Sequence, residues 1–178
     1  MKDARKENWP ILGICQGLEV LSIIMADDNL GVLDKIVIYG DNLPVTWHKS
    51  NTKDSRMFGS YPVDLLQKME TNGVALHAHT YSVSLETYNK TKGLKKEMKV
   101  LQTDTWKRPS DGKKIEFIDA MESVSYPMFA TMYHPEYQVL DFPTTSPKKW
   151  GKAEKETGEQ IAFRMSLLLN RYARQNTN

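Results

Sequence analysis

The sequence predicts a single α/β domain built from short strands and amphipathic helices. A buried strand runs into a helix around Cys15, strand-like apolar runs fill the middle of the chain, and a long amphipathic helix follows them. The chain has 178 residues, about the length of one domain. Because we find no repeat and no shift in composition, we expect residues 1–178 to form one domain.

The elements of the first third follow from local patterns. Residues 2–8 are polar and suit the end of a helix, and the apolar run Ile11–Ile14 suits a buried strand. From Leu18 to Met25 the apolar residues adopt a helical period. The apolar run 35–39 reads as a strand, and the polar stretch 42–58 reads as a surface loop.

The rest of the chain continues the mixed pattern. Helical spacing marks residues 61–69, a turn-rich connector spans 143–147, and a last helix is predicted from about Lys152 to Ala173. We interpret the lysines between 90 and 99 as a solvated helix face. Strand-like runs occupy Val74–His77, Val100–Gln102, Ile115–Ala120 and Pro127–Tyr133.

Composition excludes several classes of protein. With 40% hydrophobic and 26% charged residues, neither a disordered chain nor a fibrous repeat fits. The formal charge of +2 gives no electrostatic reason to expect nucleic acid as a partner. A single cysteine excludes a disulfide framework and a cysteine-cluster metal site. The apolar run 18–26 is too short to cross a membrane, so we expect no membrane partner.

Cys15 is the first candidate for chemistry, because it lies between Gly13 and Gly17 where a strand turns sharply into a helix. Such a turn raises a nucleophile above the sheet, and flanking glycines leave room for the neighbouring chain. The helix N-terminus favours a thiolate, and the backbone N–H of Gln16 would face a developing oxyanion. A buried structural cysteine is the alternative interpretation.

His134 is the candidate base, since it follows the strand predicted over 127–133. Pro135 favours an extended backbone at His134, which would send His134 and Glu136 to the same side. The carboxylate of Glu136 could then orient the imidazole, which completes a Cys–His–Glu relay. The alternative is a turn at the strand end with an incidental ion pair.

The other histidines are less informative. His77 and His79 would share one face of a strand, but no third ligand of suitable spacing stands nearby, so we predict no metal site. A structural or substrate-contacting role is expected for this pair. His48 lies in the polar stretch 42–58 and is expected to be solvated.

Together, Gly13–Gly17 and Tyr133-His134-Pro135-Glu136 resemble the motifs of the class I glutamine amidotransferase-like superfamily. Within it, the chain resembles the gamma-glutamyl hydrolases over nearly its whole length. The segments that carry this closer resemblance are Gly17-Leu18-Glu19, Ser55-Arg56-Met57-Phe58, His79-Thr80-Tyr81-Ser82, Ile115-Glu116-Phe117-Ile118 and Met121-Glu122.

The resemblance implies a three-layer α/β fold around a central, mostly parallel sheet. It implies hydrolysis of gamma-glutamyl bonds in folate poly-gamma-glutamates, a small-molecule substrate, without a metal or organic cofactor. It assigns Cys15 as nucleophile, His134 as general base and acid, and Glu136 as the orienting carboxylate, with His79 near the substrate. It also allows a homodimer and implies a lysosomal, vacuolar or secreted enzyme, although we find no signal peptide in the chain.

The chain departs from the family before the nucleophile. In the family, a longer segment there holds the first strands and a glycine-rich loop that donates a second oxyanion N–H. This sequence has 10 glycines and no Gly-Gly pair, so we expect the N-terminal portion of the domain to be missing. Two alternatives therefore stand beside the hydrolase: a glutaminase subunit of an amidotransferase, and an inactive truncated paralogue that only binds.

Overall fold

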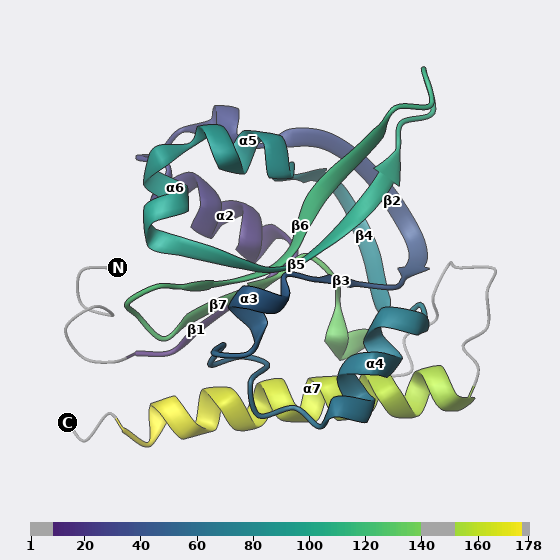
Figure 1. Cartoon of the computed structure of the whole chain (residues 1–178). Helices are drawn as coiled ribbons and strands as arrows, with labels where there is room; N and C mark the ends of the chain where they lie inside the picture. Colours follow the sequence, from purple (N-terminus) through teal and green to yellow (C-terminus); the bar gives the residue numbers. More distant parts are fainter. Residues whose placement is uncertain (1–8, 140–151, 176–178) are drawn as a thin grey trace.

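A computed structural model describes residues 9–139 and 152–175 of the chain (Figure 1). In these residues a five-stranded sheet has the order β1-β7-β6-β5-β3, and a second sheet pairs β2 with β4. The five-stranded sheet comprises β1 (Ile11–Ile14), β7 (Met128–Thr131), β6 (Lys114–Ser123), β5 (Met98–Lys107) and β3 (Thr46–Trp47). The two-stranded sheet comprises β2 (Asp34–Leu43) and β4 (Ala75–Ser82).

The direction of the strands corrects one expectation. Of the described strand pairs, β1 and β7 run parallel, whereas β7–β6, β6–β5, β5–β3 and β2–β4 are antiparallel. The α/β class is confirmed, but a mostly parallel sheet is wrong for this part of the chain. The reason is local, because the short turn 108–113 joins β5 to β6 and leaves no room for the crossover that parallel neighbours need.

Helices cover the five-stranded sheet on two sides (Figure 1). On one side lie α2 (Gln16–Met25), α5 (Leu85–Lys90) and α6 (Lys92–Glu97). On the other lie α3 (Lys49–Thr52), α4 (Val63–Thr71) and α7 (Lys152–Ala173). Two short 3-10 helices, η1 (Leu30–Val32) and η2 (Pro135–Gln138), complete the described elements. The arrangement is the three-layer one that the family resemblance implies.

Each face of the sheet buries its own hydrophobic cluster, because successive side chains of a strand point to opposite faces. Val100 and Met128 join the cluster around α2, whereas their neighbours Leu101 and Phe129 join the cluster around α7. From α7, Ile161, Met165 and Leu168 join the second cluster. On α2 the buried residues are Leu18, Leu21, Ser22 and Met25, and Val20 is exposed.

The stretch 42–58 is not the surface loop that its polarity predicts. It contains the end of β2, all of β3 and all of α3, and several of its side chains are buried. These are Val45, Thr52, Ser55, Met57 and Phe58. The predictions for residues 2–8 and for the connector 143–147 concern residues outside the described ranges.

Buried Glu122 explains why this stretch is ordered. Its carboxylate accepts hydrogen bonds from Ser55 Oγ (3.1 Å), from the N–H of Arg56 (3.1 Å) and from the N–H of Met57 (2.9 Å). The ammonium of Lys99 lies 3.0 Å away. The buried carboxylate of Glu122 thus joins β6 to residues 55–57, which are distant in sequence. Each of its oxygen atoms accepts a hydrogen bond, as buried polar groups usually do.

The basic run between residues 90 and 99 divides into two groups. Lys90, Lys92, Lys95 and Lys96 are exposed on α5 and α6, as a solvated face requires. Lys99 differs, because it lies on β5 and pairs with Glu122. The prediction holds for the helical lysines and is wrong for Lys99.

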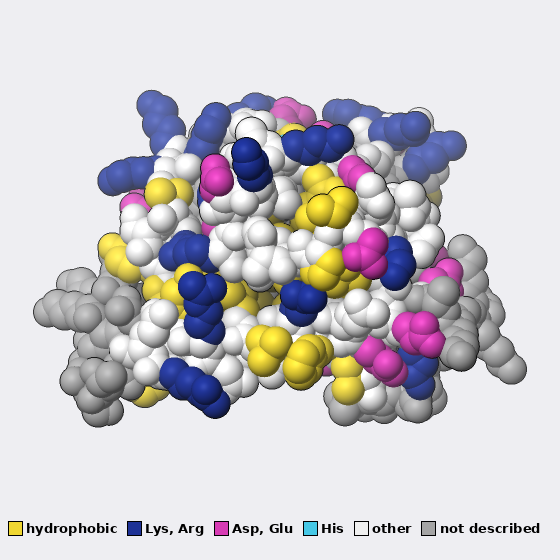
Figure 2. All heavy atoms as spheres, turned by 60° about the horizontal axis from the view of Figure 1, so that its bottom comes forward, with side chains coloured by type: hydrophobic (Ala, Val, Ile, Leu, Met, Phe, Trp, Pro, Cys, Tyr) yellow, Lys and Arg dark blue, Asp and Glu magenta, His cyan; other side chains and the backbone are white. Residues whose placement is uncertain are grey.

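The face crossed by α7 combines apolar and basic groups. Figure 2 turns this side of the molecule forward and shows hydrophobic side chains among lysines and arginines. Phe163 and Leu167 of α7 are large, exposed hydrophobic residues. Within residues 9–139 and 152–175, no helix combines the length and hydropathy needed to cross a bilayer.

Candidate active site

Cys15 occupies a sharp turn between β1 and α2. Its backbone has φ 51° and ψ −106°, a positive φ that side-chain-bearing residues rarely adopt. Two hydrogen bonds hold it there. The Cys15 N–H donates to the Thr131 carbonyl (2.8 Å), and the Cys15 carbonyl accepts from the Leu18 N–H (2.8 Å). Backbone strain of this kind persists only where surrounding contacts enforce it.

The two glycines beside the turn have different roles. A Cβ atom on Gly13 would lie 2.6 Å from the backbone carbon and oxygen of Gly17, so position 13 has no room for a side chain. A Cβ atom on Gly17 would meet nothing within 4 Å. The expectation that both glycines make room is therefore correct for Gly13 and wrong for Gly17, since the close approach involves the backbone of residue 17.

His134 follows β7 and is fixed by its backbone and its ring. Its N–H donates to the Leu76 carbonyl of β4 (2.9 Å), and Tyr137 stacks on its imidazole with centroids 4.6 Å apart. Its Nδ1 lies 2.7 Å from Oε1 of Glu136, which confirms that the two side chains meet. The extended geometry predicted for this contact is wrong, because Pro135 begins the 3-10 helix η2 and the turn brings Glu136 back.

The electrostatics of His134 follow from these neighbours. Burial lowers the pKa of the imidazole, but hydrogen bonds to Cys15 and Glu136, with the charges of both groups, outweigh burial and raise the pKa to about 9. A protonated ring can donate from both nitrogens at once. His134 is therefore paired with Glu136 through Nδ1, and Cys15 is close enough to raise the pKa of the same ring.

The sulfur of Cys15 faces the backbone of β4. The thiol is half-buried, and its Sγ lies 3.8 Å from the Ala78 carbonyl of β4. Gln16, the predicted oxyanion donor, is exposed and is the first residue of α2. The first N–H groups of a helix have no partner within it, so the Gln16 N–H is available to a ligand.

A comparison with protein-family models assigns residues 1–146 to the family described as "Glutamine amidotransferase class-I". The chain belongs to this family. The match covers the turn around Cys15 as well as His134 and Glu136. The superfamily resemblance drawn from the two motifs is thereby confirmed.

Curated relatives of this amidotransferase-family chain carry the name gamma-glutamyl hydrolase. The protein of Rattus norvegicus is 30% identical over 164 residues, which are 92% of this chain and 46% of the rat protein. The protein of Bos taurus is 32% identical over 81% of this chain and 40% of its own length. That of Homo sapiens is 29% identical over 96% and 49%. The chain therefore spans about half the length of these relatives or less.

A solved structure gives an independent view of the fold. A protein from Thermoplasma acidophilum described as a "putative gmp synthase subunit a protein" superposes with a TM-score of 0.53 at 16% identity, covering 99% of this chain and 65% of that chain. At this identity the likeness shows the fold alone. It confirms the α/β class expected for the family.

His77 and His79 of this amidotransferase-family chain lie on β4 near the relay. His77 Nδ1 and His79 Nε2 are 3.2 Å apart, and both side chains are buried. Burial lowers the pKa of His79 to about 4, against the opposing effect of hydrogen bonds with the backbone of Ile36 and Tyr81. His79 is therefore neutral at physiological pH and can serve as a hydrogen-bonding group.

His77 has two neighbours that its local sequence does not predict. Its Nε2 lies 3.2 Å from Oδ1 of Asp119, and Asp104 joins the same cluster. Burial raises the pKa of Asp119 far above its usual value, and the charge of Asp104 raises it further. The sequence did hold one signal of this cluster, because Asp119 is a charged residue in the predicted strand 115–120. His48 is likewise not simply solvated, because its Nε2 lies 3.3 Å from Thr103 Oγ1.

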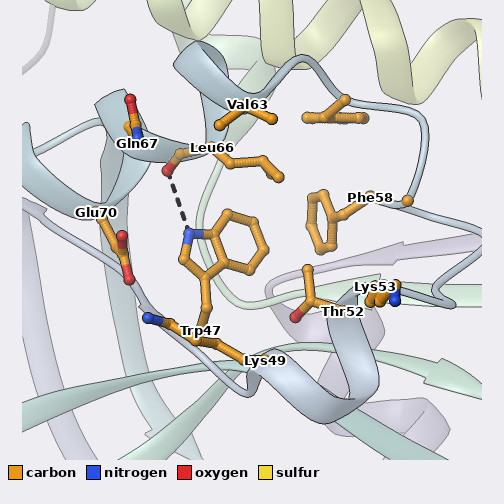
Figure 3. A pocket seen from close by; sticks show the side chains of 11 residues that line it. Trp47, Lys49, Thr52, Lys53, Phe58, Val63, Leu66, Gln67 and Glu70 are labelled. Atoms are coloured by element: carbon orange, nitrogen blue, oxygen red, sulfur yellow. Dashed lines mark hydrogen bonds between the residues drawn. The ribbon is translucent and has the colours of Figure 1, made fainter.

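A separate apolar pocket lies between β3, α3 and α4 (Figure 3). Its volume is about 380 Å³, and its walls include Trp47, Phe58 and Leu66. The Trp47 indole donates to the Leu66 carbonyl (3.2 Å) and meets the Phe58 ring edge-on at 5.1 Å. Neither Cys15 nor His134 lines this pocket, so it is not the entrance to the candidate active site.

Proposed function

We propose that this chain hydrolyses gamma-glutamyl bonds, with Cys15 as nucleophile, His134 as general acid and base, and Glu136 as the carboxylate that orients His134. The observation that carries the proposal is the 2.7 Å contact between His134 and Glu136 next to the strained turn of Cys15, which raises the pKa of the His134 imidazole. The names of the curated relatives support this choice of bond within the family. Poly-gamma-glutamyl folates are the substrate class that the family resemblance favours.

The first half of the reaction is acyl transfer to sulfur. The Cys15 thiolate attacks the side-chain carbonyl carbon of a glutamyl unit, and the carbonyl oxygen becomes an oxyanion that accepts from the Gln16 N–H. The tetrahedral intermediate then collapses. His134 gives its proton to the leaving amine as the carbon–nitrogen bond breaks, which leaves a glutamyl thioester on Cys15.

The second half returns the enzyme to its starting state. His134, now neutral, removes a proton from a water molecule, and the resulting hydroxide attacks the thioester carbonyl. The carbon–sulfur bond breaks, which releases the carboxylic acid and a thiolate beside a protonated His134. Glu136 holds the ring through Nδ1 in both steps, and His79 is the histidine that the family resemblance places near the substrate.

Mass spectrometry of a folate pentaglutamate incubated with the chain tests the proposal. We expect glutamate-shortened products from the unaltered chain and none from Cys15→Ala. A folded chain, verified by circular dichroism, that yields no shortened product would contradict the proposal, as would equal activity of Cys15→Ala. A parallel assay of ammonia released from free glutamine separates the glutaminase alternative, which predicts turnover of glutamine and not of the pentaglutamate.

A second experiment examines the nucleophile without a substrate. Cys15 is the single cysteine of the sequence, so alkylation by iodoacetamide reports on this thiol without background. We expect carboxamidomethylation at pH 7 to be roughly tenfold faster or more than that of free cysteine, because a thiolate beside an imidazolium is the reactive form. A rate equal to that of free cysteine would contradict the proposed ion pair.

A further inference from the structure

We propose that His77, Asp104 and Asp119 form a binding site for one divalent transition-metal cation of the Zn²⁺ class. The three residues come from three strands: His77 from β4, Asp104 from β5 and Asp119 from β6. One ligand atom from each lies within 4.8 Å of the others, and His77 Nε2 is 3.2 Å from Asp119 Oδ1. One imidazole and two carboxylates are a donor set that Zn²⁺ accepts, with a water molecule in a further position.

Burial without hydrogen bonds is the independent observation that points to a ligand. Asp119 is fully buried, and neither of its carboxylate oxygens has a hydrogen-bond partner among the described residues. Within the same ranges, Asp104 Oδ2 and His77 Nε2 also make no hydrogen bond. Buried carboxylates without compensation are costly, because the protein interior solvates their charge poorly.

Glu122 offers a comparison within the same strand. It is as deeply buried as Asp119, but it accepts hydrogen bonds from Ser55, Arg56 and Met57 and pairs with Lys99. The fold therefore supplies several donors and a lysine to one buried carboxylate of β6, whereas the contact given for Asp119 is the imidazole of His77, which is itself fully buried. A proton would neutralise Asp119 but would leave acceptor positions unfilled, whereas a divalent cation would balance both aspartates and engage both together.

The local backbone presents the three ligands to one point. Gln102 pairs with Ala120 and Thr103 pairs with Ile118, so Asp119 is the extra residue of a β-bulge. A bulge re-aims the side chain at that position. Asp104 uses Oδ1 to accept from the Thr105 N–H (2.5 Å), which leaves Oδ2 for a cation.

Such a site would connect the two sheets. β5 and β6 belong to the five-stranded sheet, whereas β4 belongs to the two-stranded sheet. β4 also carries the Leu76 carbonyl that holds His134 and the Ala78 carbonyl that faces Cys15. The inferred role of the cation is structural, because it would hold β4 in place beneath the catalytic groups.

Metal content of the untagged chain, dialysed against metal-free buffer, tests the inference. We expect about one Zn²⁺ per chain in the unaltered protein and less than ~0.1 in Asp119→Asn. Asp111→Asn is the matched control, since Asp111 is a partly exposed aspartate paired with Arg108 in the β5–β6 turn. Cys15→Ala should keep its metal, and X-ray absorption should show nitrogen and oxygen ligands without sulfur.

Two outcomes would overturn the inference of a metal site at His77, Asp104 and Asp119. Metal lost in Cys15→Ala and kept in Asp119→Asn would place the cation at the catalytic relay. An unaltered chain that retains no metal, and whose melting temperature neither Zn²⁺ nor Mn²⁺ raises, would show that the aspartates share protons instead. We expect Zn²⁺ to raise the melting temperature of the unaltered chain by ~5 °C or more. Melting with and without added metal needs no variant, so it tests the metal site even if Asp119→Asn fails to fold.

Discussion

The Nδ1 atom of His134 lies 2.7 Å from Oε1 of Glu136, although the two residues are separated by a proline that begins a 3-10 helix. The side chain of His134 is mostly buried, whereas that of Glu136 is 36% exposed. The carboxylate can therefore stabilise an imidazolium without a full desolvation cost of its own. This contact fixes the orientation of the ring and the protonation state on which the proposed reaction depends.

Glu136→Gln tests the contact through activity. We expect kcat to fall ~10²-fold or more, because a misoriented base or a wrong tautomer transfers protons poorly. The alkaline limb of kcat/KM should move to lower pH, since loss of the carboxylate charge lowers the pKa of His134 from about 9 towards its usual value. The measurement is a pH profile of both variants, and an unmoved alkaline limb would contradict the role assigned to Glu136.

The same pair predicts a pH dependence of stability. The folded-state pKa of His134 is raised to about 9 from 6.5, so its contribution to the free energy of unfolding is complete below about 6.5 and is lost as pH rises through 9. The stability difference between the unaltered chain and Glu136→Gln should therefore shrink between pH 7 and 9.5. Urea unfolding at several pH values measures it, and a difference that grows with pH would refute the assignment.

Gly13→Ala tests the close approach at the nucleophile turn. The added methyl group would lie 2.6 Å from the Gly17 backbone, so strand and helix must separate. We expect a loss of ~1–3 kcal/mol in stability and a large loss of activity. Gly17→Ala is the matched control, because its methyl group meets nothing within 4 Å. Thermal melts and Cys15 alkylation rates compare the two, and equal effects would contradict the steric explanation.

Glu122→Gln tests the buried carboxylate that organises residues 55–58. Loss of its charge leaves Lys99 without its buried partner and weakens the bonds from the backbone of Arg56 and Met57. We expect a loss of ~2–4 kcal/mol in the free energy of unfolding. Glu86→Gln, which removes an exposed pair with Lys90, should leave the free energy of unfolding nearly unchanged. Urea unfolding measures both, and similar losses would argue against the anchoring role.

Local sequence patterns were sufficient to predict many of the strands and helices. The strand Ile11–Ile14 and the helix Lys152–Ala173 agree with their predicted bounds, because their periodicity depends only on residues within a few positions. Polarity was a poorer guide in the stretch 42–58. There the order comes from Glu122, whose donors are contributed by a segment far away in the sequence.

By itself, the sequence determined the strand–turn–helix at Cys15, the choice of His134 and Glu136 as its partners, and the family. These depend on short motifs whose spacing is visible along the chain. Only the tertiary structure decided that most of the described strand pairs are antiparallel, that Gly13 rather than Gly17 is sterically required, and that His77 meets Asp104 and Asp119. Each of these depends on contacts between distant segments, which form only when the sheets assemble and bury their side chains.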